Sequence, residues 1–94
     1  MAIIVETLVT RASKAEVDSL DDSINAAIGQ MGGPPDGLMA QIIRPDGDGF
    51  LMSAVWRNED EMRPFYDVIL SKLADLGLEP DEPKISPVWV FARP

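Results

Sequence analysis

Short apolar runs and longer amphipathic segments alternate along the chain. The short runs are rich in β-branched and aromatic residues, which is typical of strands. They lie at residues 2–9, 38–44, 50–56 and 84–92. Between them, residues 13–31 and 58–76 carry apolar side chains every three or four positions, which is the spacing of an amphipathic helix. The pattern predicts the order β-α-β-β-α-β within a single domain of residues 1–94.

The first helix has clear signals at both ends. The segment from Ser13 to Glu16 matches a capping box, in which Ser13 is the N-cap and Glu16 bonds back to the free N–H groups of the first turn. Gly32 or Gly33 then ends the helix, and two prolines follow. The predicted buried stripe consists of Val17, Leu20, Ile24, Ala27, Ile28 and Met31.

The second helix follows a strand that ends at Trp56. Asn58 is a candidate N-cap, and the acidic residues 59–61 suit the positive end of a helix. The predicted buried stripe is Met62, Phe65, Ile69, Leu73 and Leu76, with Tyr66 and Leu70 beside it. Because Pro64 lacks a backbone donor, we expect a loose or kinked first turn, or a helix start near Arg63.

Residues 45–49, Pro-Asp-Gly-Asp-Gly, are a strong turn signal, so the strands on either side should form an antiparallel hairpin. A calcium loop beginning at Asp46 is excluded, since its twelfth position is Arg57. With right-handed crossovers, the element order gives a ferredoxin-like α+β sandwich, with a four-stranded antiparallel sheet and both helices on one face.

The strands are apolar on both faces, although two helices can cover only one. In the first strand, one face carries Ile3, Val5, Thr7 and Val9, and the other Ile4, Glu6 and Leu8. The second strand offers Leu38, Ala40 and Ile42 against Met39 and Ile43. The third offers Phe50, Met52, Ala54 and Trp56 against Leu51 and Val55. Such an open face is larger than monomers usually expose, so we predict a homodimer that stacks sheet on sheet.

Composition and charge exclude several classes of function. The net charge of −8 disfavours nucleic acid and membrane surfaces as partners. The chain has no cysteine and no histidine, which excludes disulfides, a cysteine nucleophile, an imidazole base and histidine-ligated zinc or haem. We expect no cofactor and no metal. Residues 1–9 do not resemble a signal peptide, and no apolar run approaches the ~20 residues of a membrane helix, so a soluble cytoplasmic protein is expected.

The pattern as a whole resembles the dimeric α/β-barrel superfamily, which includes the antibiotic biosynthesis monooxygenase-like and stress-responsive barrel proteins. The resemblance is carried by residues 37–78, "GLMAQIIRPDGDGFLMSAVWRNEDEMRPFYDVILSKLADLGL", with Gly-Leu, a strand, a Gly-rich turn, a strand closing on Val-Trp and a capped helix. It implies a small bacterial member that acts on or binds a small molecule.

The chain departs from the haem-degrading members of that superfamily. Those members use an asparagine on the first strand, a tryptophan on the second helix and a histidine further along it. By position, Glu6 or Thr7 stands for the asparagine and Phe65 for the tryptophan, but no residue stands for the histidine. The resemblance therefore does not imply haem degradation.

Three polar residues lie inside otherwise apolar strands and are candidate ligand-binding residues. Glu6 could act as a base or bind a ligand hydroxyl if buried, or could face solvent or pair with Arg44 or Arg57. Gln41 and Ser53 could line a pocket with Glu6, or could hydrogen-bond each other across the hairpin.

Four aromatic residues are further candidates for a cleft that accepts a planar ligand, or else are core and dimer contacts. They are Trp56, Phe65, Tyr66 and Trp89.

Three functions remain open. The chain could be a small-molecule binder, with a small apolar or aromatic molecule as ligand. It could be a cofactor-independent monooxygenase or isomerase acting on an aromatic or polyketide-like substrate, with Glu6 or Tyr66 handling the proton. It could also be a structural dimer without a ligand. The lack of histidine favours the binder.

Overall fold

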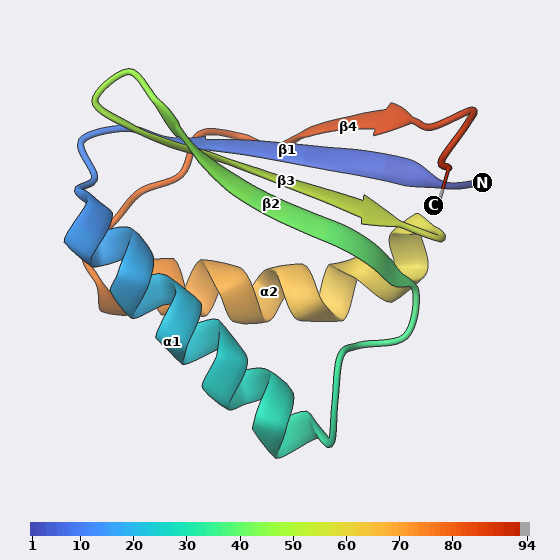
Figure 1. Ribbon diagram of the computed structural model, residues 1–94, viewed down its shortest axis with the longest axis horizontal. Helices are drawn as coiled ribbons and strands as arrows, with labels where there is room; N and C mark the ends of the chain where they lie inside the picture. The colour runs from blue at the N-terminus through green and yellow to red at the C-terminus, as the bar shows by residue number, and fades with distance from the viewer. Residues whose placement is uncertain (93–94) are drawn as a thin grey trace.

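The computed structural model describes residues 1–92 and has the predicted element order (Figure 1). The strands are β1 (Ile3–Val9), β2 (Leu38–Asp46), β3 (Gly49–Trp56) and β4 (Lys84–Pro87). The helices are α1 (Lys14–Met31) and α2 (Glu59–Asp75). The ferredoxin-like α+β prediction is confirmed.

Helix α1 begins and ends as its sequence predicts. The Ser13 hydroxyl accepts a hydrogen bond from the Glu16 backbone N–H, and the Glu16 carboxylate accepts from the Ser13 backbone N–H, which completes the capping box. At the other end, Gly32 has a φ of 86°, a left-handed conformation that glycine adopts without steric cost.

Helix α2 is capped by Asn58, whose side-chain oxygen accepts from the Glu61 N–H at 2.9 Å. The expected helix start near Arg63 is wrong. The helix begins at Glu59 and is continuous through Pro64, because the cap and three acidic residues stabilise its first turn ahead of the missing donor.

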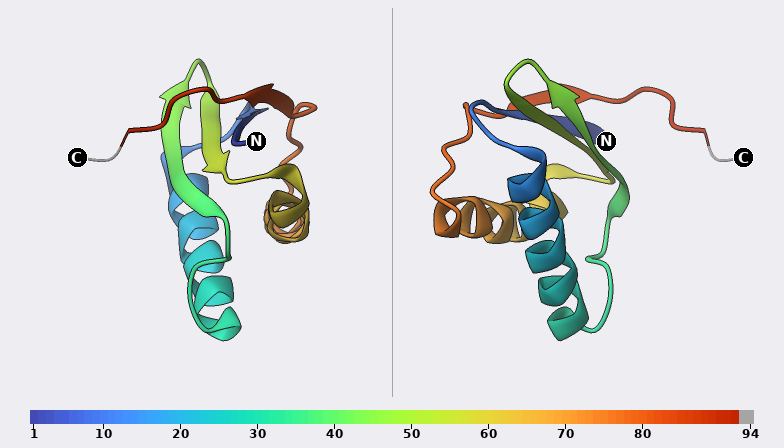
Figure 2. Two further views of the ribbon diagram at one scale, coloured as in Figure 1. Left: turned by 90° about the vertical axis from the view of Figure 1, so that its right-hand side faces the viewer. Right: turned by 60° about the vertical axis from the view of Figure 1, so that its left-hand side comes forward.

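The sheet has the strand order β2-β3-β1-β4 and is antiparallel throughout. Both helices lie on one face of it, and the opposite face is bare in all views (Figures 1 and 2). Helix α2 runs along the sheet, whereas α1 slopes away from it toward Met31. Accordingly, Leu20 and Ile24 are buried, but Met31 is 52% exposed.

The register shows which side chains point toward the helices. In β1 the predicted faces are confirmed, since alternate residues from Ile3 to Val9 are buried. In β3 the predicted faces are also confirmed, because Phe50, Met52 and Trp56 are buried. The hairpin packs tightly on β1: a Cβ added at Gly49 would lie 1.8 Å from the Val9 carbonyl oxygen.

Strand β2 corrects the prediction of strict alternation. A register shift between Leu38 and Ala40 places Leu38 opposite Trp56, on the helix side, and Ala40 opposite Val55, on the open side. Such a bulge inserts one extra residue and reverses the face of everything beyond it.

Strand β4 is shorter than predicted and ends at Pro87 rather than residue 92. Proline has no N–H to continue a ladder, and the last link is the Val88 N–H bonded to the Ala2 carbonyl at 2.8 Å. The chain then leaves the sheet, and Trp89 and Val90 are 90% and 84% exposed.

Candidate functional site

A small cavity lies between the sheet and α2, in the middle of the covered face. Its volume is about 20 Å³. It is lined by Val5, Thr7, Gln41, Met52, Ala54, Trp56, Tyr66 and Ile69. These residues come from β1, β2, β3 and α2. The walls are apolar apart from a few side chains, which is the usual make-up of a small-molecule site.

The polar centre of the cavity is a hydrogen bond between the Thr7 and Tyr66 hydroxyls, whose oxygens are 3.0 Å apart. Both residues are buried, with 1% and 9% exposure. Each hydroxyl has one proton and two lone pairs, so the pair retains bonding capacity after making its mutual bond. A ligand oxygen in the cavity could use that capacity.

An aromatic wall adjoins this centre. The rings of Trp56 and Phe65 lie 5.9 Å apart at an interplanar angle of 51°, within the range of tilted aromatic pairs. Trp56 lines the cavity together with Tyr66, while Phe65 packs behind it. The structure thus brings together three of the four aromatic candidates. Trp89 lies outside, on the exposed segment after β4.

Gln41 stands at the boundary between the cavity and the protein surface. It pairs with Ala54 in the sheet and faces the helices. Besides the cavity, it lines a second space of about 340 Å³ between α1 and β2. We call this space the α1–β2 groove, and it is lined by Lys14, Val17, Asp18, Asp21, Ile24, Gln41 and Ile43.

Glu6 and Ser53 lie on the opposite face of the sheet, where they are paired in register. They therefore do not line the cavity, and Gln41 and Ser53 cannot bond to each other across the hairpin because they point to opposite faces. The expected pairing of Glu6 with an arginine is not formed with Arg57, which binds Glu61. In the sheet register, the other neighbour of Glu6 is Lys84.

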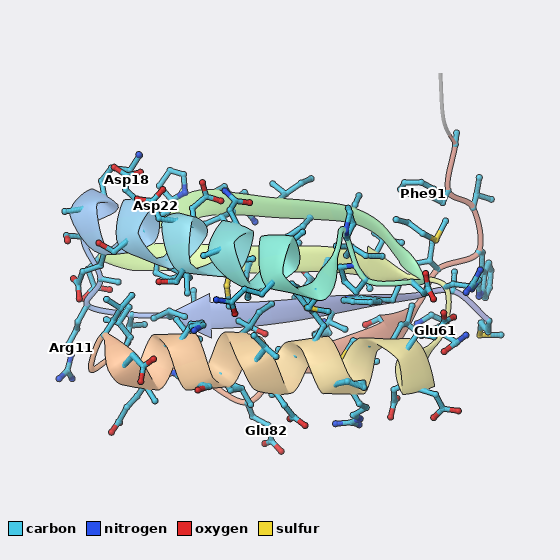
Figure 3. The ribbon with its side chains drawn as sticks, turned by 90° about the horizontal axis from the view of Figure 1, so that it is seen from below. Arg11, Asp18, Asp22, Glu61, Glu82 and Phe91 are labelled. Carbon is cyan, nitrogen blue, oxygen red and sulfur yellow. The ribbon has the colours of Figure 1, made fainter. Side chains whose placement is uncertain are left out.

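The start of α2 carries the clearest electrostatic feature. Arg57 forms a two-point ion pair with Glu61, with Nε to Oε1 at 2.7 Å, and Asn58 donates to the same carboxylate. The hydrogen bond from Arg57 lowers the pKa of Glu61 from its usual 4.5 and raises that of Arg57. Figure 3 shows Glu61 at this end of α2, and Asp18 and Asp22 on the far side of α1.

The described residues 1–92 offer no group of three or more carboxylates placed to hold a metal ion. Within the same part of the chain, neither helix has the length and apolar character that a membrane span requires.

The candidate site residue that sequence reasoning missed is Thr7. The sequence analysis places it on one face of the first strand and otherwise names it only as a possible counterpart of the asparagine in haem-degrading proteins. A hydroxyl buried in an apolar strand requires a partner, and Tyr66 was already a candidate on the facing helix. That requirement could have indicated a hydrogen bond between Thr7 and Tyr66 from the sequence.

Comparison with known proteins identifies the fold. No protein-family model and no curated protein sequence matches the chain. Among solved structures, a mutant of SnoaB from Streptomyces nogalater, a cofactor-independent oxygenase, superposes with a TM-score of 0.65 at 14% identity, over 96% of this chain and 94% of the SnoaB chain. A protein from Deinococcus radiodurans, proposed to be an antibiotic biosynthesis monooxygenase, gives 0.60 at 17% identity, over 99% and 97%.

A de novo designed protein matches equally well, with a TM-score of 0.64 at 12% identity, over 94% of this chain and 99% of the design. This fold is therefore reached by sequences of unrelated origin, and function has to be argued from the site. At the level of the fold the predicted resemblance is confirmed: the chain has the ferredoxin-like fold of the antibiotic biosynthesis monooxygenase-like proteins.

Proposed function

We propose that the protein binds a small molecule between the sheet and α2. The observation that carries this proposal is the buried Thr7–Tyr66 hydroxyl pair at an apolar cavity with an aromatic wall. A pair needed only for stability could be replaced by apolar side chains of similar shape at little cost. A polar pair that faces open space can recognise a ligand.

The site favours a neutral, planar molecule with one hydroxyl or carbonyl oxygen. Trp56 offers a flat apolar wall, and the hydroxyl pair offers one polar point. No basic side chain lines the cavity, and the net charge of −8 repels anions. We also propose that the protein is cytoplasmic, since a chain without cysteine suits a reducing compartment.

The alternative is a cofactor-independent oxygenase, the activity of SnoaB. That chemistry needs a group to take a proton from the substrate. Among the cavity-lining residues, Tyr66 is the one titratable side chain, and Glu6 lies on the other face. A phenol bonded to Thr7, with no carboxylate or imidazole lining the cavity, is a poor base, so binding is the better-supported function.

We also propose that a second copy covers the open face of the sheet. This open face, as we call it, carries Ile4, Leu8, Ala40, Ile42, Leu51 and Val55, with Glu6, Arg44, Ser53, Lys84 and Ser86 among them. Of these apolar side chains, that of Ile42 is 60% exposed. An apolar surface of this extent is typical of a subunit interface, and its charges of both signs allow two copies to pair. A structural dimer with an unused cavity is the remaining alternative.

The binding test uses 2-naphthol, a neutral planar phenol, with naphthalene-2-sulfonate as its anionic counterpart. Nuclear magnetic resonance titration should shift the backbone signals of Thr7, Ala54 and Tyr66 with naphthol and leave them unmoved with the sulfonate. Tyr66→Phe should weaken naphthol binding about tenfold, the equivalent of one hydrogen bond. The matched control is Ser53→Ala on the open face, which should bind like the unmodified protein. Absence of naphthol binding, or shifts confined to the open face, would refute the proposal.

A further inference from the structure

We infer that Gln41 is a gate, and that ligands reach the Thr7–Tyr66 cavity from the α1–β2 groove when the Gln41 side chain swings aside. This inference rests on the proposed binding function, since it concerns the route into the same cavity. It also makes a claim about solvent access that can be tested without any ligand.

The volumes show why a moving part is needed. The cavity of about 20 Å³ has room for roughly one water molecule, far less than a planar organic molecule requires. The α1–β2 groove, at about 340 Å³, falls within the range of small-molecule sites. Gln41 is the residue common to both linings, so its displacement joins the two spaces.

The side chain of Gln41 is not held in place by a hydrogen bond. It is unbranched and half-buried, and within residues 1–92 its amide has no hydrogen-bond partner. A swing toward the groove therefore breaks no bond and exposes the amide to water. By contrast, Tyr66 and Thr7 would lose their mutual bond if either moved, so they stay in place.

Helix α1 slopes away from the sheet (Figures 1 and 2). The groove between α1 and β2 is lined in part by Lys14, Asp18 and Asp21, which are exposed to solvent. Lys14 is paired with Asp18, so these three residues carry a net charge of −1. This charge disfavours the passage of anions and does not oppose that of a neutral molecule.

Trp56 provides the first test, because it lines the cavity and is only 2% exposed. Trp89→Phe removes the other, exposed tryptophan, so that the remaining fluorescence reports the cavity alone. In that background, Gln41→Ala should raise quenching of Trp56 by acrylamide severalfold. Gln30→Ala, which shortens the chain's only other glutamine on the exposed side of α1, should leave quenching unchanged.

The route itself is tested by narrowing the groove. Asp21→Phe adds bulk to its wall and should reverse most of the increase caused by Gln41→Ala, whereas Asp22→Phe, which lies outside the lining, should not. Unchanged quenching in Gln41→Ala would overturn the gate. Increased quenching that Asp21→Phe fails to reduce would overturn the groove as the route.

Binding kinetics separate this inference from the proposed function. Because the ligand fits only when Gln41 is displaced, Gln41→Ala should speed naphthol association severalfold and lower the Kd, with a smaller change in the dissociation rate. Binding with unchanged rates would refute the gate while the binding function stands. Increased quenching of Trp56 without naphthol binding would refute the function and leave the gate as a property of the fold.

Discussion

The two faces of this sheet are built from similar residues and differ in what covers them. On the helix side, Val5 and Phe50 are 3% and 1% exposed, and even the polar Thr7 is 1% exposed. On the open face, Ile42 is 60% exposed, and Ile4, Leu8 and Leu51 on the same face are half-buried. Apolar character along a strand therefore tells little about which face forms the core, because position relative to the helices decides it.

The polar residues on the two faces differ in the same way. Thr7 is bonded to Tyr66 across 59 residues of sequence, which ties β1 to α2. Glu6, its neighbour in the chain, is paired in the sheet register with Ser53 and Lys84 of the adjacent strands. On the covered face a polar group needs a partner within the chain, whereas in the single chain a polar group on the open face can bond to water.

Truncation of neighbouring residues in β3 should give the largest contrast. Phe50→Ala removes a fully buried side chain and should lower the free energy of unfolding by about 3–5 kcal/mol. Leu51→Ala points to the open face and should cost about 1 kcal/mol in dilute protein, where it is half-solvated. Urea unfolding of both variants at low concentration measures the difference. Equal losses would contradict the assignment of the two faces.

Breaking the buried hydroxyl pair should have an intermediate effect. Tyr66→Phe leaves Thr7 without its partner and should cost about 1 kcal/mol, as should Thr7→Val. The double variant should lose less than the sum, since the second change removes a group that is already unpaired. Ser53→Ala, on the open face, should stay within about 0.5 kcal/mol. Fully additive losses in thermal unfolding would show that the two hydroxyls act independently.

A charged residue introduced on the open face should weaken dimer formation and change the stability of the single chain little. Ile42→Lys alters an exposed side chain, so the stability of the single chain should change by less than about 0.5 kcal/mol. Native mass spectrometry should show a dimer for the unmodified protein and a monomer for this variant. Met31 is also an exposed apolar residue but lies on α1, so Met31→Lys is the matched control and should remain dimeric. Loss of the dimer in both variants would point to a surface other than the open face.

The smallest expected effect is the loss of unfolding free energy at low pH when Glu61 is protonated. The Arg57 hydrogen bond holds the pKa of Glu61 below its usual 4.5, so the ionised form is favoured by folding. Its contribution is full above about pH 4.5 and is lost as the pH falls through the lowered pKa. In Glu61→Gln, the unfolding free energy should depend less on pH in that range. Glu82→Gln, an exposed carboxylate on the loop before β4, should keep the original dependence.

Much of the fold could be read from the sequence because its signals are local. The Ser13 and Asn58 caps and the Gly32 helix end each depend on a few adjacent residues, and each is confirmed. The bulge after Leu38 could not be predicted, because it depends on pairing with β3. The end of β4 at Pro87 was missed because the apolar residues that follow continue the strand pattern.

The candidate site was harder to predict because it depends on which way side chains point. Gln41 lies beyond the bulge, so its face could not be deduced by counting along the strand. Glu6 stood out as the one charged residue of the first strand, but alternation alone does not say which face the helices cover. Tyr66 and Trp56 were found because large aromatic side chains are few in this chain.

The short last strand also affects how chains can meet at the edges of their sheets. β4 is an edge strand of four residues, it ends on Pro87, and Pro83 precedes it. Neither proline can donate a backbone hydrogen bond, and Lys84 adds a charge at the same place. This edge therefore offers little to another chain that would extend the sheet into a continuous ribbon. Growth by strand addition is disfavoured there, which leaves β2 as the edge of the sheet at which another chain could pair.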